Sequence, residues 1–84
     1  MKTVENLINA NNNKKIGNHR KEYVASGQKY YYYATCICEV NHDTQKVILD
    51  KSWGSQSTTR AVNAYMRELK QRFTTRNYTF EIIE

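Results

Sequence analysis

The sequence has no uninterrupted apolar run of about 18 residues, which is the length that a membrane-spanning helix needs. We therefore expect no transmembrane segment. Its first residues, Met1 to Asn13, lack both the continuous apolar core and the small-residue cleavage site of a secretory signal. Cysteine is scarce, with two residues. In the absence of a signal, two cysteines favour a reducing cytoplasm and no disulfide framework, so we expect a cytoplasmic protein.

Short motifs that carry catalytic chemistry are also missing. The chain has no glycine-rich phosphate loop, no G-x-S-x-G, no H-E-x-x-H and no pair of spaced carboxylates. His42 and Asp43 are adjacent, but a catalytic pair would also need a nucleophile and a shaped pocket, and ordinary turn residues explain them more simply. We expect a protein that is not an enzyme and uses no cofactor.

The two cysteines are separated by one residue, Ile37. In a strand this spacing puts Cys36 and Cys38 on the same side, with Cα atoms about 6.5–7 Å apart, at or past the usual disulfide limit. Neither His19 nor His42 completes a zinc spacing with them. We expect two small buried thiols under a helix and no metal site.

Positive charge is in excess. Lysine and arginine number 13 against 8 acidic residues, which gives a formal charge of +5 and a pI of about 9.3. This balance favours an acidic partner, such as a nucleic acid, a nucleoprotein or an acidic protein face, and it argues against a DNA mimic. The alternative is that the charge only keeps a small domain soluble.

Two segments have helical periodicity, within a length of 84 residues that fits a single domain, 1–84. "TVENLINA" places Val4, Leu7 and Ile8 on one face of a short N-terminal helix. "TTRAVNAYMRELKQRF" predicts a long amphipathic helix from about Thr58 to Phe73. Its apolar arc contains Val62, Tyr65, Met66, Leu69 and Phe73. Its opposite arc contains Arg60, Asn63, Ala64, Arg67, Lys70 and Gln71.

Four segments alternate as strands do. They are Arg20–Ala25, Gln28–Val40, Lys46–Trp53 and residues 77–83, and the basic stretch 14–21 is expected to be a loop that leads into the first. In Lys46–Trp53, the residues Val47, Leu49 and Trp53 share one face. We predict an α+β domain in the order α-β-β-β-α-β: a three-stranded antiparallel meander, the long helix packed on one face of the sheet, and a C-terminal strand beside one of the three. Spacing alone leaves the place of that last strand open.

The run "QKYYYYATCICEV" has two different faces when it is read as one strand. One face carries Tyr30, Tyr32, Ala34, Cys36, Cys38 and Val40. The side chains on this face become small in the middle of the strand, as expected where the long helix crosses the sheet. Tyr31 and Tyr33 share the other face, where they could stack bases, anchor a protein interface, or pack beneath the N-terminal helix.

Two groups of cations are candidate binding residues, since either could grip phosphates or simply be solvated. The first group lies in the basic stretch and contains Lys14, Lys15, Arg20 and Lys21. The second lies on the long helix and contains Arg60, Arg67 and Lys70. With Tyr31 and Tyr33, these residues form our expected partner- or nucleic-acid-binding set.

The segment Ser55–Met66, "SQSTTRAVNAYM", resembles a motif of small phage proteins of unassigned function. In these, a strand hairpin leads into Ser-x-Thr-Thr, a basic residue and a helix with aromatic and aliphatic anchors. Comparable positions here are Ser55 or Ser57, Thr58, Thr59, Arg60, Tyr65 and Met66. The resemblance implies no catalytic residues. It implies an accessory phage protein of the kind that binds and blocks host machinery, including CRISPR effectors.

From these observations we expect a non-enzymatic, anti-CRISPR-like binding protein that occupies a surface on a host nucleic-acid-handling machine. One alternative is a module that binds DNA or RNA directly through a basic face. A second is a structural subunit that assembles with copies of itself through weakly protected edge strands.

Overall fold

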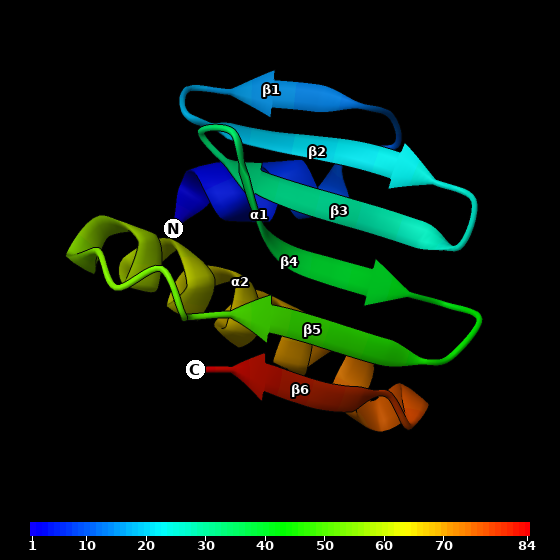
Figure 1. The fold of residues 1–84 in the computed structure, drawn as a ribbon. Helices are drawn as coiled ribbons and strands as arrows, with labels where there is room; N and C mark the ends of the chain where they lie inside the picture. The colour runs from blue at the N-terminus through cyan, green and yellow to red at the C-terminus, as the bar shows by residue number, and fades with distance from the viewer.

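A computed structural model describes residues 1–84 and confirms the α+β class (Figure 1). The two helices are α1 (Lys2–Asn9) and α2 (Gln56–Phe73), and α2 runs into a short 3₁₀ turn, η1 (Thr74–Arg76). The strands are β1 (Lys14–Ile16), β2 (His19–Val24), β3 (Gly27–Tyr32), β4 (Thr35–Asn41), β5 (Lys46–Asp50) and β6 (Thr79–Ile83).

All six strands form one sheet in sequence order, β1-β2-β3-β4-β5-β6. Every neighbouring pair up to β5 is antiparallel, whereas β6 lies parallel to β5 at the edge of the sheet. A parallel pair needs a long crossover, and α2 provides it. This gives the C-terminal strand the position that spacing alone left open.

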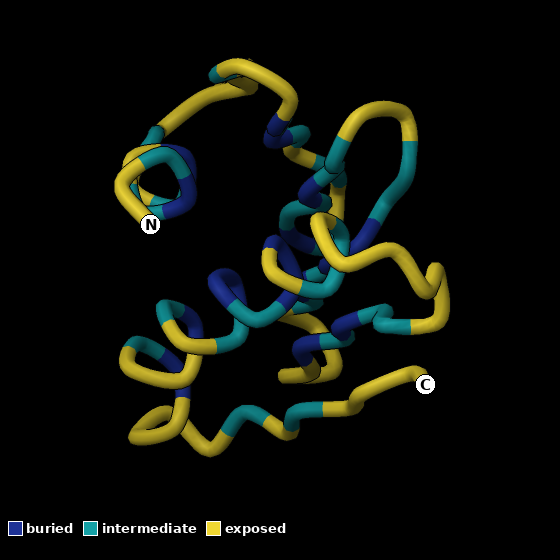
Figure 2. The backbone as a smooth tube through the Cα atoms, turned by 90° about the vertical axis from the view of Figure 1, so that its left-hand side faces the viewer, coloured by how far each residue is buried: buried dark blue, intermediate teal, exposed yellow.

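Both helices cover the same face of the sheet and lie behind it in the view of Figure 1. Helix α1 lies against β1, β2 and the side of α2, and α2 lies against β4 and β5. In Figure 2 the buried stripe of α1 points toward the sheet. The opposite face of the sheet has no helix over it, so the N-terminal helix does not cover Tyr31.

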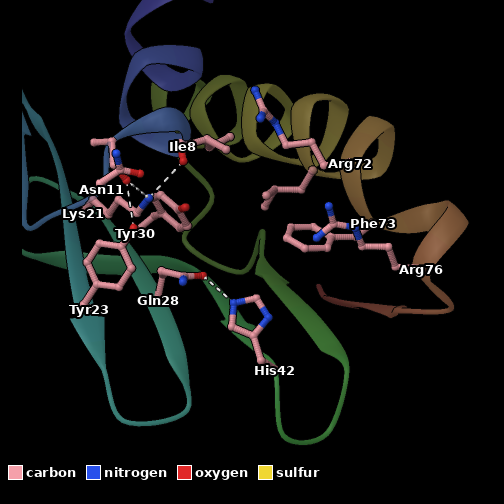
Figure 3. Close-up of a pocket in the computed structure, with 12 residues that line it drawn as sticks. Ile8, Asn11, Lys21, Tyr23, Gln28, Tyr30, His42, Arg72, Phe73 and Arg76 are labelled. Atoms are coloured by element: carbon pink, nitrogen blue, oxygen red, sulfur yellow. Dashed lines mark hydrogen bonds between the residues drawn. The ribbon is translucent and has the colours of Figure 1, made fainter.

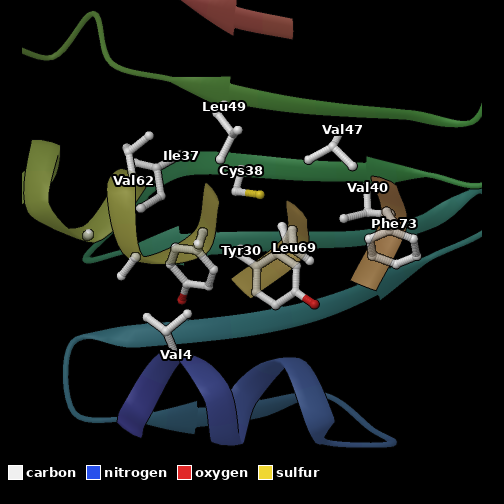
Figure 4. Close-up of a cluster of buried hydrophobic side chains, with 13 residues drawn as sticks. Val4, Tyr30, Ile37, Cys38, Val40, Val47, Leu49, Val62, Leu69 and Phe73 are labelled. Carbon is white, nitrogen blue, oxygen red and sulfur yellow. The ribbon is translucent and has the colours of Figure 1, made fainter. Parts of the chain in front are cut away.

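The core lies between this sheet face and the helices (Figure 4). It contains the predicted Val62, Tyr65, Leu69 and Phe73 of α2 and residues of β3, β4 and β5. The prediction is wrong for Ala64, which the helical period places on the opposite arc but which is buried in the core. The N-terminal helix contributes Val4, as its periodicity predicts. Ser55 caps α2 by accepting a hydrogen bond from the backbone N–H of Thr58 at 3.3 Å, which satisfies one of the free donors at the helix start.

The predicted three-stranded meander is wrong in its strand count, because five strands precede α2. One difference lies in the basic stretch 14–21, which forms a hairpin rather than a loop. Ile16 pairs with His19, and Gly17 takes the positive φ of 59° that a two-residue hairpin turn favours.

The other difference lies in the tyrosine run, which is two strands and not one. The chain turns at Tyr33 and Ala34, so that Tyr32 pairs with Thr35. Tyr33 has a φ of 56°, an unusual conformation for a bulky side chain. It is held from outside the turn: the Tyr33 N–H donates to the carbonyl of Asn18 at 2.8 Å, and the Asn18 amide donates to the Tyr33 hydroxyl at 2.9 Å.

A bulge in β4 also changes the predicted faces. The register shifts so that Cys38 pairs with Tyr30 and Cys36 pairs with Tyr31, which leaves Ile37 as the extra residue. Ile37 and Cys38 are therefore both buried in the core, and Cys36 lies half-buried on the helix-free face. The prediction of two thiols side by side under a helix is wrong for Cys36.

Trp53 is the last departure from the predicted faces. Val47 and Leu49 are buried as predicted, but β5 ends at Asp50 and the chain leaves the sheet there. The indole of Trp53 is 57% exposed and donates from Nε1 to Asp50 Oδ2 at 3.2 Å. Neither helix is long and apolar enough to span a membrane.

Candidate functional site

The hairpin fold separates the four cations of the basic stretch. Lys21 points to the helix side, where only 3% of it is exposed. Its ammonium donates to the carbonyl oxygens of Ile8 at 3.0 Å and Ala10 at 2.8 Å, just where α1 ends. Two of its three protons are thus used to cap a helix. The expectation that Lys21 grips a partner does not agree with this burial. Lys14 pairs with Lys21 in the register and is exposed.

Lys15 and Arg20 are register partners on the helix-free face. With Tyr33 they line an open hollow of about 460 Å³ beside the two tight turns, together with Asn18 and Ala34. Tyr33 is 63% exposed there. Three of the expected binding residues are therefore neighbours, although Tyr33 reaches this place from a turn and not from a strand.

Tyr31 is half-buried on the same face and is not a free platform. The guanidinium of Arg20 covers its ring at 4.0 Å from the centroid. Arg20 also forms an ion pair with Glu22 at 3.1 Å, and Glu22 lies within 3.5 Å of the Tyr31 hydroxyl. A base could stack on Tyr31 only after Arg20 moved away.

The cations of α2 form a different surface. Arg60, Arg67 and Lys70 are exposed on the side of the helix that faces away from the core, and none of them forms an ion pair. Gln56, Asn63 and Gln71 share this side of the helix, with Gln56 before the cations, Asn63 among them and Gln71 after them. We call these six residues the α2 stripe.

Charge is distributed unequally between the two faces of the molecule. The helix-free sheet face carries four cations and four carboxylates: Lys15, Arg20, Lys29 and Lys46 against Glu22, Glu39, Asp50 and Glu81. Its ion pairs, Lys29 with Glu39 at 3.6 Å and Lys46 with Glu81 at 3.7 Å, cross neighbouring strands. This face is therefore neutral overall, and the excess of +5 belongs to the helices, the turns, the chain ends and the helix side of β1 and β2, where Lys14 and Lys21 lie.

Sequence reasoning missed Trp53 as a surface residue because the alternation of β5 assigned it to the core. It lies in the loop before Ser55, next to the first turn of the α2 stripe. An exposed tryptophan in the loop that leads into a helix with unpaired arginines has the composition of an interface hot spot. The signal that could have identified it is the sequence Asp50-Lys51-Ser52, since Asp50 accepts hydrogen bonds from the Ser52 backbone and side chain and ends the strand.

Sequence reasoning also missed a pocket of about 360 Å³ between the end of α1, the sheet and the end of α2 (Figure 3). It has four basic groups in its lining, Lys21, His42, Arg72 and Arg76, and no carboxylate. Its aromatic lining residues are Tyr23, Tyr30 and Phe73. No linear motif links the lining residues, since the complete lining comes from five separate segments of the chain.

The structure contains no group of three or more His, Cys, Asp or Glu side chains placed to hold a metal ion. His42 is adjacent to Asp43 in the sequence, but its imidazole forms hydrogen bonds elsewhere. Nδ1 lies 2.6 Å from the Tyr78 hydroxyl, and Nε2 lies 3.1 Å from Gln28 Oε1. Burial raises the pKa of both the Cys36 and Cys38 thiols, which disfavours the thiolate form that a nucleophile or ligand requires.

Comparisons of the chain with protein-family models, with curated proteins and with solved structures found no match.

Proposed function

We propose that the protein is a non-enzymatic binding module that docks an anionic macromolecular surface against the α2 stripe, with Trp53 at one end of the contact. The observation that carries this proposal is the segregation of charge. A neutral sheet face and a cationic helix side give the molecule one preferred orientation toward a polyanion.

The geometry of α2 supports this choice over the hollow near Tyr33. Arg20 in the hollow is already paired with Glu22, and it would lose that partner on binding an anion. Arg60, Arg67 and Lys70 have no carboxylate partner to lose. They lie along a rigid helix, so that little conformational entropy is lost by the backbone on binding.

The partner under this proposal is an anionic surface of a nucleic-acid-handling machine, as the resemblance of Ser55–Met66 to small phage proteins implies. Occupying such a surface would block the machine without any catalysis. The proposal makes the protein an inhibitor of anti-CRISPR type.

Direct binding of DNA or RNA is the second candidate function, and the same unpaired cations favour it. It would show a strong salt dependence, because each neutralised phosphate releases counterions. A salt-titrated binding assay with duplex DNA and single-stranded RNA separates the two candidates: a steep slope identifies phosphates as the target, whereas no binding even at low salt leaves the protein partner.

A pull-down from host lysate tests the main candidate with a charge-matched design. The triple variant R60Q/R67Q/K70Q removes three charges from the α2 stripe, and K15Q/K29Q/K46Q removes three from the sheet face. We expect the first variant to lose the captured partner and the second to keep it. Equal loss from both variants would show that only net charge matters, and the proposal would be abandoned.

Trp53 gives an independent signal for the same contact, since it is the single tryptophan of the chain. Its fluorescence should shift to the blue when the purified partner is added, and Trp53→Ala should weaken binding by about 2 kcal/mol if it is a hot spot.

A further inference from the structure

The pocket at the ends of the two helices has the features of a ligand site that is separate from the α2 stripe. We propose that it binds a small organic anion of the nucleoside monophosphate class, with the phosphate held by Arg72 and Arg76 and the base placed among Tyr23, Tyr30 and Phe73 (Figure 3). Its volume of about 360 Å³ lies at the lower end of the range for small-molecule sites.

Arg72 carries an unsatisfied hydrogen-bond donor. Arg72 Nε is buried and has no hydrogen-bond partner, and it is the one such side-chain atom in the structure. Leaving a buried donor unpaired costs about 1–3 kcal/mol, more when the group is charged. Cations in the last turn of a helix often serve only to offset the helix dipole, which would explain the charge of Arg72. It would not explain why Nε is buried without an acceptor.

Hydrogen-bond donors outnumber acceptors around the pocket. Lys21 is 3% exposed and keeps one ammonium proton beyond the two that cap α1. The Tyr30 hydroxyl forms no hydrogen bond with the protein, although the ring is buried. With two guanidinium groups and no carboxylate nearby, the pocket offers donors that lack acceptors. A nucleoside monophosphate would supply the acceptors: its phosphate oxygens for the two guanidinium groups, and the acceptor atoms of its base for Lys21 and the Tyr30 hydroxyl.

Gln28 and the aromatic lining residues offer a place for the base. Gln28 Oε1 accepts a hydrogen bond from His42 Nε2 at 3.1 Å, and His42 Nδ1 shares a hydrogen bond with the Tyr78 hydroxyl at 2.6 Å. Because these bonds fix the orientation of the Gln28 amide, its NH₂ group is left free at the pocket wall. A planar ring among three aromatic side chains, with an amide donor at its edge, is the arrangement that binds a nucleobase.

The exposed lining residues show how a ligand would enter. Asn11, Tyr23, His42 and Arg76 are exposed and form the mouth, while Tyr30, Leu69 and Phe73 form the buried wall. Arg76 lies over the ring of Phe73 at 5.6 Å, at the boundary between the two. The phosphate would therefore sit near Arg76 and Arg72, with the ring directed toward Tyr30.

The test is a titration of the ¹⁵N-labelled protein with AMP, monitored at the backbone amides of Tyr23, Gln28, Tyr30 and His42. We expect saturable shifts at these positions. Adenosine lacks the charge and ribose 5-phosphate lacks the base, so each should bind about tenfold more weakly or worse. A 5′-phosphorylated dinucleotide that binds as tightly as AMP would identify the end of a nucleic acid strand as the source, and its failure to bind would identify the free nucleotide.

Arg72→Gln should weaken AMP binding at least about tenfold, and Arg76→Gln, at an exposed position, tests the same subsite without risk to the core. Arg67→Gln is the matched control, because it removes one charge from the outer side of the same helix. Three results would overturn the proposal: no shifts with AMP or the phosphorylated dinucleotide, equal weakening by Arg67→Gln, or inorganic phosphate binding as tightly as AMP. The pull-down that tests the α2 stripe uses a different ligand and a different readout, so the two proposals fail separately.

Discussion

The ammonium of Lys21 lies 3.0 Å from the carbonyl oxygen of Ile8 and ties strand β2 to the end of helix α1. A helix as short as α1 is not stable alone in water, so it depends on such tertiary contacts. Lys21 is buried beside the rings of Tyr23 and Tyr30, at 4.8 and 5.7 Å, which offset part of the cost of burying its charge.

Replacing Lys21 by Met keeps the aliphatic stem and removes the charged donor. The Ile8 carbonyl would lose its partner inside the protein, and the Ala10 carbonyl would keep only the Tyr23 hydroxyl, which donates to it at 2.8 Å. We expect a loss of about 2–4 kcal/mol in the free energy of unfolding, measured by urea denaturation, and a lower melting temperature.

Lys14→Met is the matched control for this change, since Lys14 pairs with Lys21 in the sheet register but is exposed. It should alter the free energy of unfolding by less than about 0.5 kcal/mol. Equal effects from the two variants would mean that Lys21 contributes nothing beyond surface charge.

The cluster of cations from Lys14 to Lys21 shows what sequence can and cannot predict. Composition correctly identifies a basic segment, but a strand turns successive side chains to opposite faces. Arg20 therefore stacks on Tyr31 on the open face, while Lys21 is buried on the other. Which face is buried depends on where α1 packs, and no local pattern encodes that.

Most buried positions of α2 were predictable for a physical reason, because Val62, Leu69 and Phe73 recur at the helical period. The period assigns Ala64 to the wrong side, since its small side chain is covered by the close packing of the helix. The turn at Tyr33 was not predictable, since it contains no glycine, asparagine or proline and is held by Asn18 from another hairpin. The pocket around Arg72 was hidden for the same reason, because its residues meet only in the folded sheet.

Gln45, in the turn between β4 and β5, has a φ of 54° and an exposed side chain without a hydrogen bond. Asn41 Oδ1 holds this turn by accepting from the N–H groups of Asp43 and Thr44. The left-handed conformation costs about 1–2 kcal/mol for an ordinary residue, and Gln45→Gly would remove this strain. Glycine also makes the unfolded backbone more flexible, which offsets part of the stabilisation. We expect a net stabilisation of about 0.5–1 kcal/mol in urea denaturation.

Asn77→Gly provides the comparison for Gln45→Gly. Asn77 also has a positive φ, 63°, but asparagine tolerates this conformation. The substitution should leave the stability nearly unchanged. A larger gain at Asn77 than at Gln45 would show that strain is not the cause.

The two thiols should react at different rates because the bulge places them on different faces. Cys36 is half-buried, and Cys38 lies in the core. Burial raises the pKa of both thiols, so little thiolate is present at neutral pH. We expect iodoacetamide to modify one thiol slowly in the folded protein and both in denaturant, as measured by mass spectrometry. Cys36→Ser should abolish the native reaction, and modification of Cys38 in that variant would contradict the burial.

His19 couples stability to pH through its position in the core. Its ring is mostly buried between Tyr32, at a centroid distance of 4.9 Å, and Tyr65, whose hydroxyl lies 3.1 Å from Nδ1. Burial lowers the pKa of His19 below its ordinary value of 6.5, because the charged form loses water. Between the folded and unfolded pKa values, the unfolded chain binds more protons, so acid favours unfolding.

Stability should therefore be intact above the unfolded pKa of about 6.5 and fall as the pH is lowered toward the pKa of the folded state. Urea midpoints measured from about pH 7.5 to about pH 5 would show this slope. His19→Gln keeps a hydrogen-bonding group near Tyr65 but cannot titrate, so its midpoint should depend less on pH over this range. His42→Gln, with His19 intact, is the control and should keep the slope that His19 causes. If the urea midpoint of His19→Gln depended on pH as strongly as that of the parent protein, the buried imidazole would not be the source of the pH dependence.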